Sequence, residues 1–588
     1  MICKPFGYEA LCSHRTIRVL AESVADLGIP TLRFDYAGTG DSEDLQPRAD
    51  QIQAWVADIV AAVGELRRRL GVESVCLLGF RLGAMLATLA AAKCGHGGAL
   101  ILGAPVVSGR RYLRDLRTTH LASLMGLGER SSDAGLGADG SLEVSGYELS
   151  AASIAALSQI DLANITSLSV SRVLIIDRDD LPAARNWHQE LSRRGVCADY
   201  LALPGFVQML MTAPQSAVVP QAIVAAACSW LLAAELKPAG PAREAHAKPR
   251  ASALEVASPT LRLPGASPGP EAMVVERPVT FGADPPLFGI VSEPRAQELR
   301  RRAVILLNTG ADWHTGVGRL YVSLARSWAR RGYHVLRMDL EGLGDSGTRK
   351  DRASDEVFPP GAIEGIGAAI EMLGTRYGIR DVTLAGLCSG AYHALRAAVA
   401  GLPVRRILMV NPQNFFWKQG TKLEELQLAD IVRNPAIHRE RLFSAGAWRR
   451  LLAGEINVWR IMRVYLHRPL LTLRRILRDL TRSLHIRLPS DLGWELEHID
   501  SRALRIVFVF ARGEPGIDLL ALQAGSSIRR LGERCRVHIV DGADHTFSNG
   551  WSRAALEAIL SAELFVEQTQ SVVAPLGAVP LGLSDQSS

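Results

Sequence analysis

A cysteine placed between two glycines is the first feature of the sequence that points to chemistry. Residues 382–390 read VTLAGLCSG, so a strand-like run leads into Gly386, Cys388 and Gly390, and an alanine-rich segment follows. A strand, Gly-x-nucleophile-x-Gly and then a helix make a tight turn, the nucleophile elbow, that exposes the central side chain. The dipole of the following helix favours a thiolate there. We therefore predict that Cys388 is a nucleophile; Ser389 is a distant second, because its spacing to the glycines does not fit.

A nucleophile of this kind requires a histidine base that a carboxylate orients, in the chain order nucleophile, acid, histidine. His545 follows the last predicted strand, in the segment DGADHTF, and is the predicted base. The acid is expected in the segment that follows the preceding strand in sequence, within residues 511–518. Asp518 stands directly before a predicted helix and is the first choice, with Glu514 as the alternative acid. Such a triad attacks the acyl carbon of an ester or a thioester.

The elements that must position these residues alternate between strands and helices. Most of the later strands are continuous apolar runs, as expected for parallel strands that helices cover on both faces. The alternation predicts an α/β architecture with doubly wound, mostly parallel sheets. In the second half of the chain the predicted strands are Val274–Phe281, Leu287–Glu293, Ala303–Asn308, His334–Asp339, Asp381–Gly386, Arg406–Asn411, Arg505–Phe510 and Cys535–Asp541.

The first half of the chain repeats the second. Leu20–Ser42 and Leu324–Ser346 align without a gap and are identical at 12 of 23 positions, and both end in the turn Asp-x-x-Gly-x-Gly-Asp-Ser. The segment Val75–Gly83 matches the elbow of the second half. Counterparts of the first two predicted strands are missing, so we expect the first copy to be truncated at its N-terminus or to start upstream of Met1.

The first copy carries different residues at the chemical positions. Arg81 stands where the second copy has Cys388, and Gln208 occupies the loop of the histidine, although Asp180 remains as a possible acid. Arginine cannot attack an acyl carbon and glutamine cannot accept the proton. The first copy is therefore predicted to be non-catalytic. The turn Asp339–Ser346 occurs in both copies, so it is predicted to serve the fold rather than catalysis.

The sequence predicts two domains and two less regular segments. Residues 1–235 form the first domain, and residues 272–567 form the catalytic domain. Between them, residues 236–271 are rich in Pro, Ala and Ser and are predicted to be a linker that proteases cut first. Residues 568–588 are predicted to be a loose tail. Residues 412–504 are an insertion at the place of a helical lid.

Arginines gather in the predicted lid. From Arg433 to Arg487 there are 13 arginines against Glu440, Glu455 and Asp479. One interpretation is an ordinary solvated helix face. The other is a docking surface for an anion, such as an acyl carrier protein, the phosphates of coenzyme A or an anionic membrane. Nucleic acid is less favoured, because few aromatic residues are interleaved with the arginines.

Composition excludes several classes of protein. The 588 residues are 48% hydrophobic with a formal net charge of +6, which excludes disorder for most of the chain and a chain-wide nucleic-acid binder. A P-loop, a dinucleotide fingerprint and a metal-ligand cluster are all missing from the sequence, so we predict no cofactor, no metal and no nucleic acid partner.

Cysteine usage and hydropathy indicate the compartment. The eight cysteines include no C-x-x-C pair, so neither a zinc site nor a disulfide framework is expected. No basic segment precedes an apolar stretch at the N-terminus, which argues against a signal peptide. Ala217–Ala234 is the best candidate for a membrane span, but it contains Pro220 and Gln221 and is predicted to be a buried helix. We therefore predict no transmembrane segment and a cytoplasmic location.

The elbow 386–390, the turn 339–346 and the loop 541–547 resemble those of the α/β-hydrolase superfamily. The resemblance covers nearly the whole chain and implies two tandem α/β-hydrolase domains, the second with a helical lid. It also implies an oxyanion hole made by the backbone N–H of Ser389 and that of Thr309 or Gly310.

The first unit looks like the serine-aminopeptidase-like hydrolases that accompany bacterial exosortase systems. The residues that carry this likeness are 6–9, 34–36 and 146–150. The cysteine at position 388 departs from the serine that is usual in the superfamily. In the elbow alone, this cysteine is similar to dienelactone hydrolases and polyhydroxyalkanoate synthases.

Two functional hypotheses remain open from the sequence. The first is an enzyme that acts on a small-molecule acyl substrate, either as an ester or thioester hydrolase or as an acyltransferase that uses an acyl carrier protein or coenzyme A. The second is a binding or scaffold protein in which both copies have lost catalysis. The complete set of Cys388, His545 and an acid in the second copy favours the enzyme.

Overall fold

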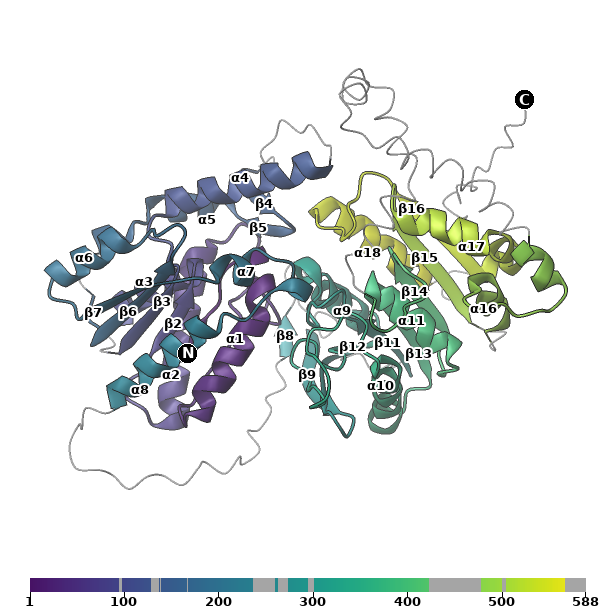
Figure 1. Cartoon of the computed structure of the whole chain (residues 1–588), viewed down its shortest axis with the longest axis horizontal. Helices are drawn as coiled ribbons and strands as arrows, with labels where there is room; N and C mark the ends of the chain where they lie inside the picture. Colours follow the sequence, from purple (N-terminus) through teal and green to yellow (C-terminus); the bar gives the residue numbers. More distant parts are fainter. Residues whose placement is uncertain are drawn as a thin grey trace, which may run out of the picture.

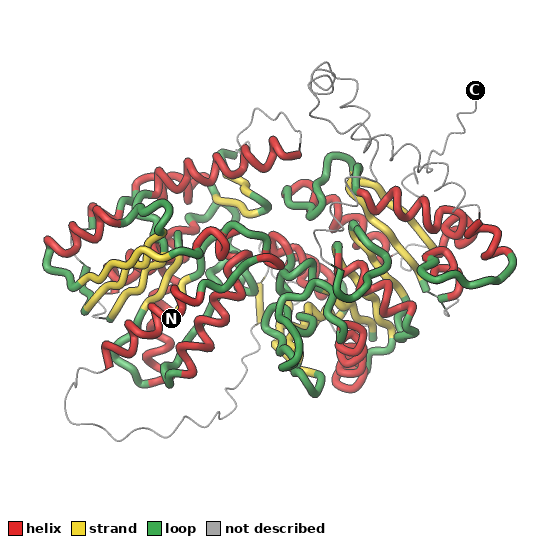
Figure 2. The backbone as a smooth tube through the Cα atoms, in the orientation of Figure 1, coloured by secondary structure: helices red, strands yellow, loops and turns green. Residues whose placement is uncertain are grey.

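Two large sheets with helices on both faces dominate the part of the chain that the structure describes (Figure 1). The computed structural model describes residues 1–94, 98–127, 137, 139–165, 168–235, 260–262, 273–294, 301–421, 477–499 and 504–565. The first half of the chain forms one sheet and the second half forms the other, and in Figure 2 helices flank the strands of each. The α/β architecture predicted from the sequence is therefore confirmed for both halves.

The first half is built on five parallel strands in the order β1-β2-β3-β6-β7. A two-stranded antiparallel hairpin, β4–β5, lies outside this sheet. The strands are β1 (Ile2–Cys3), β2 (Leu77–Phe80), β3 (Ala99–Gly103), β4 (Leu142–Val144), β5 (Tyr147–Leu149), β6 (Arg172–Arg178) and β7 (Ala198–Leu203). The helices are α1 (Tyr8–Asp26), α2 (Gln51–Leu70), α3 (Leu82–Cys94), α4 (Gly109–Leu127), α5 (Ala151–Gln159), α6 (Arg185–Arg193), α7 (Phe206–Leu210) and α8 (Gln221–Glu235), with short 3-10 turns η1 (Leu162–Asn164) and η2 (Pro214–Ser216).

The second half carries nine strands in the order β16-β15-β14-β13-β11-β12-β10-β9-β8. Strands β11 to β16 pair in parallel, whereas β8, β9 and β10 add an antiparallel edge. The strands are β8 (Thr260–Arg262), β9 (Met273–Phe281), β10 (Leu287–Pro294), β11 (Arg302–Leu307), β12 (His334–Met338), β13 (Asp381–Leu387), β14 (Arg406–Val410), β15 (Arg505–Ala511) and β16 (Cys535–Val540). The helices are η4 (Val317–Arg319), α9 (Leu320–Arg330), α10 (Ala362–Tyr377), α11 (Ser389–Val399), α16 (Leu492–His498), α17 (Pro515–Leu531), η5 (Gly532–Arg534) and α18 (Gly550–Phe565).

Alternate residues of the central strands enter two different cores. On β11, Ala303, Ile305 and Leu307 belong to one cluster of buried side chains, whereas Val304 and Leu306 belong to another. Because side chains alternate across a strand, a continuous apolar run fills both faces of the sheet at once. Apolar runs in the sequence therefore locate all eight predicted strands of this half to within one residue at each end.

Some sequence predictions need correction. In the first half, the segment of the repeat that aligns with β12 forms only a single bridge, between Ile2 and Arg33. Within the range predicted as linker, Thr260–Arg262 pairs with β9 and extends the second sheet. The other linker residues that were predicted, the tail 568–588 and residues 422–476 of the predicted lid lie outside the described residues.

The candidate membrane segment 217–234 is largely helix α8. Its residues Ile223, Val224 and Ala227 pack into the core between α1 and the first sheet. None of the described helices combines the length and the apolar character that a membrane crossing requires.

The two halves contact one another through the turn that they share in sequence. Arg33 of the first half donates to Asp345 at 2.6 Å, and the equivalent residue of the second half, Arg337, pairs with Asp41. In each pair, the arginine of one half thus binds the aspartate at the equivalent turn position of the other half. The sequence predicts that this turn serves the fold. In the structure, Asp41 and Asp345 of the two turns also join the two halves.

A second contact is made by the β4–β5 hairpin, which lies near the start of α18 (Figure 1). Arg553 donates to the carbonyl of Gly146 at 2.7 Å, and Glu143 accepts from the N–H of Gly550 at 2.9 Å. The two halves are therefore held together at two separate places, by residues 312 apart in sequence at the first and 407 apart at the second.

Candidate active site

The turn between β13 and α11 has the geometry of a nucleophile elbow. Cys388 lies between the strand and the helix with φ 54° and ψ −111°, a region that side chains rarely adopt. Its N–H donates to the carbonyl of Val410 at 2.8 Å. The structure therefore places the predicted nucleophile at the carboxyl edge of the sheet and at the start of a helix, as the glycine spacing predicted.

The two glycines of the elbow leave no room for side chains. A Cβ on Gly386 would lie 2.4 Å from the carbonyl carbon of Gly390, and a Cβ on Gly390 would lie 2.5 Å from the carbonyl oxygen of Leu307. Both contacts are with backbone, which cannot move aside at low cost. The glycines therefore let α11 approach β11 and β13 closely enough to hold Cys388 in its strained conformation.

His545 lies opposite the elbow and contacts two partners. Its Nδ1 is 2.9 Å from the Glu514 carboxylate, and Cys388 lies near enough to its ring to influence its pKa. Burial by itself would lower the pKa of His545, but the hydrogen bonds and charges of Cys388 and Glu514 raise this pKa well above its usual value. The three residues thus form a continuous chain from sulfur through imidazole to carboxylate.

Of the two predicted acids, Glu514 is the one that contacts His545. Helix α17 begins at Pro515, four residues earlier than the sequence suggested, so Asp518 lies in the first turn of the helix and is exposed to solvent. Glu514 immediately precedes this helix, directly after the loop that follows β15. This position brings its carboxylate to His545. The geometry therefore favours the alternative acid, Glu514, over Asp518, the first choice made from the sequence.

Two side chains that the sequence analysis did not select hold the histidine loop. Asn411, at the end of β14, donates to the carbonyl of His545 at 2.7 Å and accepts from the N–H of Ala511 at 2.8 Å. Gln413 lies 3.3 Å from the Nδ1 of His545. Asn411 also has a positive φ of 43°. A polar residue directly after a buried apolar strand was the available signal.

The predicted oxyanion-hole residues lie beside the elbow, but one of them is engaged. Gly310 donates its N–H to the hydroxyl of Ser389 at 2.8 Å, and the same hydroxyl lies 3.3 Å from the carbonyl of Asn308. Ser389 is buried, so its hydroxyl is unsuited to act as the alternative nucleophile. As the first residue of α11, Ser389 keeps an N–H that has no acceptor within its own helix. Thr309 contacts the hydroxyl of Tyr321 through its own hydroxyl at 3.1 Å.

Tyr321, which the sequence analysis did not select, holds the elbow through hydrogen bonds to the backbone. Its hydroxyl donates to the carbonyl of Leu307 at 2.8 Å and accepts from the N–H of Leu387 at 3.1 Å. Burial is the main cause that raises the pKa of Tyr321 to about 12, so the hydroxyl stays protonated at neutral pH. This residue therefore connects the strand that carries Cys388 with the loop that carries Thr309.

The first half repeats the elbow with different chemistry. Arg81 has φ 53° and donates its N–H to the carbonyl of Gly103 at 3.0 Å, which reproduces the backbone of Cys388. Its guanidinium forms an ion pair with Glu9 at 2.8 Å. Asp180 pairs with Arg178 at 2.6 Å, and Gln208 lies in the short helix α7. The described residues of this half bring no nucleophile, histidine and acid together at the elbow.

Only part of the predicted lid is described, and one of its arginines has a structural role. Arg482 is buried and pairs with Asp491, the residue that caps α16. Such an arginine is not available to bind an external anion. Arg474 and Arg475 of the predicted docking surface lie outside the described residues.

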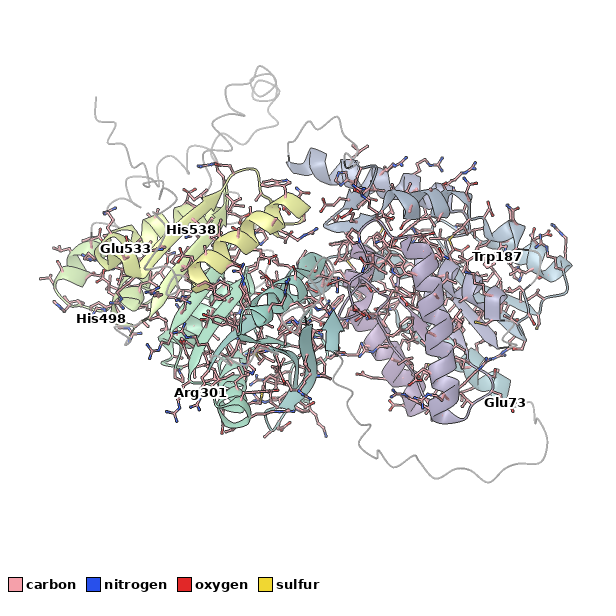
Figure 3. All side chains as sticks on the ribbon, turned by 180° about the vertical axis from the view of Figure 1, so that it is seen from behind. Glu73, Trp187, Arg301, His498, Glu533 and His538 are labelled. Atoms are coloured by element: carbon pink, nitrogen blue, oxygen red, sulfur yellow. The ribbon has the colours of Figure 1, made fainter. Side chains whose placement is uncertain are left out.

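Two other polar clusters with histidines are engaged in contacts away from Cys388. His538, which is labelled in Figure 3, lies on β16 and contacts Glu563 at 2.9 Å, so it is paired away from Cys388. His314, Asp339 and Asp345 are the one group among the described residues whose atoms could jointly hold a metal ion. Both ring nitrogens of His314 already contact carboxylates, and Asp345 pairs with Arg33 of the other half. The group therefore serves the interface between the halves.

A cavity of about 770 Å³ lies between the two halves of the chain. Its walls come from the loops after β1 and from α2 in the first half, and from α9 and α18 in the second. Neither Cys388 nor His545 lines it. The chemistry expected from the sequence is thus located at the elbow and not in this cavity.

Comparisons with known proteins agree with the fold of both halves. Residues 304–558 match the model of the alpha/beta hydrolase family, and residues 12–131 match the model described as serine aminopeptidase, S33. The chain therefore contains α/β-hydrolase domains in two regions. The elbow and the Cys388–His545–Glu514 arrangement fall within the first of these matches. A search of curated proteins finds no significant match to the sequence.

Solved structures similar to this chain are also hydrolase-like. A serine hydrolase homologue from Coxiella burnetii is 14% identical and covers 49% of this chain and 97% of its own, with a TM-score of 0.29. A dienelactone hydrolase from Anabaena variabilis is 12% identical, with coverages of 50% and 98% and a TM-score of 0.30. An esterase from Pyrococcus furiosus is 13% identical, with coverages of 53% and 97% and a TM-score of 0.29.

Proposed function

We propose that this protein hydrolyses an ester or a thioester through a triad of Cys388, His545 and Glu514. One observation carries the proposal: His545 contacts both a carboxylate and a cysteine that sits at a strained elbow. The pairing with a histidine and a carboxylate separates this elbow from that of the first half, where Arg81 has the same positive φ but pairs with Glu9.

The geometry supports the following sequence of steps. The Nε2 of His545 takes the proton of the Cys388 thiol, the Sγ attacks the acyl carbon, a C–S bond forms, and the carbonyl electron pair moves to oxygen. The oxyanion is held by the N–H of Ser389 and by that of Thr309 or Gly310; Gly310 must exchange the Ser389 hydroxyl for the oxyanion. When the intermediate collapses, His545 protonates the departing alcohol or thiol from its Nε2. Glu514 holds the proton on Nδ1 throughout.

Water completes the cycle. His545 accepts a proton from a water molecule that attacks the acyl-enzyme, and collapse of the second intermediate breaks the C–S bond and releases the acid. The free enzyme returns with Cys388 and His545 paired as before. A second acyl acceptor in place of water would make the protein an acyltransferase with the same triad, using coenzyme A or an acyl carrier protein.

We also propose that the two halves arose by tandem duplication and that the first has become non-catalytic. Support comes from the repeated sequence and from the shared backbone of the two elbows, with φ 53° at Arg81 and 54° at Cys388. The match of the first half to the serine aminopeptidase model supports its likeness to that family; an association with an exosortase system stays a prediction. All eight cysteines are free, which supports a reducing cytoplasmic location.

The test is a panel of acyl esters and acyl thioesters of increasing chain length. We expect turnover by the wild type, loss of at least 10³-fold in Cys388→Ala and His545→Ala, and residual activity in Cys388→Ser. Cys197→Ala is the matched control, because Cys197 is an exposed free thiol. Undiminished turnover in Cys388→Ala would refute the assignment. Addition of coenzyme A or carrier protein to the assay separates transfer from hydrolysis by the product.

A further inference from the structure

The loop that follows β11 carries one side of the oxyanion hole, and the first half of the chain holds it. This loop, residues 309–319, begins with Thr309 and Gly310 beside the elbow and ends at the start of α9. Within its own half it is anchored by Asn308, which donates to the carbonyl of Asp312 at 2.9 Å. Several of the other polar and aromatic contacts of this loop are made with residues of the first half.

The strongest of these anchors is an ion pair between the halves. His314, in the middle of the loop, has one ring nitrogen 2.7 Å from Asp339 and the other 2.8 Å from Asp41 of the first half. Burial by itself would lower the pKa of His314, but the two carboxylates raise it well above its usual value, so the ring is charged at neutral pH. A buried imidazolium between two carboxylates fixes both the position and the orientation of the loop.

Arg319 ties the end of the loop to the same turn of the first half. Its guanidinium donates to the carbonyls of Gly40 and Ser42, each at 2.8 Å, and pairs with Asp44 at 2.6 Å. All three partners lie in one turn of the first half. Arg319 has a positive φ of 62°, so its backbone is held in a conformation that these bonds help to maintain.

Three close approaches complete the contact. The Trp313 ring stacks on His14 of the first half at 4.1 Å between centroids and 18° between planes. The carbonyl of Gly146 would lie 3.0 Å from a Cβ on Gly318. Gln215 reaches to 3.7 Å from the position of a Cβ on Gly310, next to the oxyanion hole itself. These residues, like the ion pairs, come from several separate segments of the first half.

We propose that the non-catalytic half positions the oxyanion loop of the catalytic half, with Asp41 acting through His314 and the turn Gly40–Asp44 acting through Arg319. The inference rests on the proposed function, because it assigns a role in acyl chemistry. Asp41 and Arg319 are positioning residues that do not touch the substrate. The first half then has a catalytic purpose although its own elbow carries Arg81.

Two measurements on the full-length protein separate this proposal from the triad itself. Alkylation of Cys388 by iodoacetamide needs the thiolate and His545 but no oxyanion hole, because displacement at a saturated carbon forms no oxyanion. Turnover of an ester needs all three. Loss of one oxyanion donor costs about 10² to 10³ in kcat. For a displaced loop we expect kcat to fall about 10- to 100-fold in Asp41→Asn and in Arg319→Gln.

In both variants the alkylation rate of Cys388 should stay within about twofold of the wild type, and KM should change little. Arg33→Gln is the matched control, since it removes another ion pair between the halves, to Asp345, without touching the loop 309–319. The control should keep its kcat. Thermal unfolding of each variant verifies that the fold is intact.

The possible outcomes are distinct. A fall in kcat with unchanged alkylation in Asp41→Asn and Arg319→Gln, but not in Arg33→Gln, supports the proposal. An unchanged kcat, an equal fall in all three variants, or a parallel fall in alkylation and turnover overturns it. If Cys388 of the wild type reacts no faster than an ordinary exposed thiol such as Cys197, the proposed function fails instead, and the two failures are distinguishable.

Discussion

In the proposed triad, the carboxylate that contacts His545 belongs to a glutamate, Glu514. Glu514 has one more methylene than aspartate and stands directly before α17, so its carboxylate spans the distance to His545 from a residue outside the helix. Asp518, one turn into the helix, is exposed to solvent. The difference between the two is therefore a matter of where the helix begins.

The charge of Glu514 should set the alkaline limit of activity. Cys388 and Glu514 raise the pKa of His545 well above its usual value, so the imidazolium persists above neutral pH and activity should fall as pH rises through that pKa. Glu514→Gln keeps a hydrogen-bond acceptor but loses the charge, so the alkaline limb of kcat/KM should move to lower pH by roughly 1 to 3 units. Asp518→Asn is the control and should leave the profile unchanged. A shifted profile in Asp518→Asn together with an unchanged profile in Glu514→Gln would identify Asp518 as the acid.

At the scale of elements, the elbow depends on how closely α11 can approach the sheet. A Cβ on Gly390 would clash with the backbone of Leu307. A Cβ on Gly367 in α10 would have no neighbour closer than 3.7 Å. Both are helical glycines. Helix propensity alone favours alanine over glycine by about 1 kcal/mol at either position.

This pair gives a matched test of the packing argument. Gly367→Ala should leave activity unchanged and raise stability by about 0.4 to 1 kcal/mol. Gly390→Ala should displace the elbow, lower kcat at least 10-fold and reduce stability, because the clash is with backbone. Steady-state kinetics and urea unfolding measure both effects. Equal behaviour of the two variants would show that the close approach of α11 is dispensable.

At the scale of the whole molecule, the two halves use corresponding residues for unequal tasks. Arg33 and Arg337 occupy the same position of the repeat, and each pairs with an aspartate of the other half. The side chain of Arg33 is 26% exposed, whereas that of Arg337 is 0% exposed and also binds Glu276. The repeat is thus similar in geometry and different in burial.

Burial predicts which of the two pairs matters for stability. Removing one partner of a buried ion pair leaves an uncompensated charge and typically costs about 3 to 5 kcal/mol, whereas a partly exposed pair is worth about 1 kcal/mol or less. Arg337→Met should therefore destabilise the protein several-fold more than Arg33→Met. The midpoint of urea unfolding measures the difference. Similar losses in the two variants would contradict the argument from burial.

The sequence by itself determined the parts of this protein that depend on local pattern. Apolar runs located the strands of the second half to within one residue, and glycine spacing located Cys388 at its elbow. Such features follow from the periodicity of strands and from steric limits on single residues. The proposal that the first half is non-catalytic also rests on residue type, because Arg81 and Gln208 cannot serve as nucleophile and base.

Only the tertiary structure decided which side chains meet. The choice between Glu514 and Asp518 depended on the first residue of α17, and helix ends are set by local contacts that the pattern leaves open. The hydroxyl of Ser389 turned out to hold Gly310, and Asp41 turned out to reach His314 across 273 residues of sequence. Contacts between distant segments arise from the packing of two folded halves, and no short pattern in the chain encodes that packing.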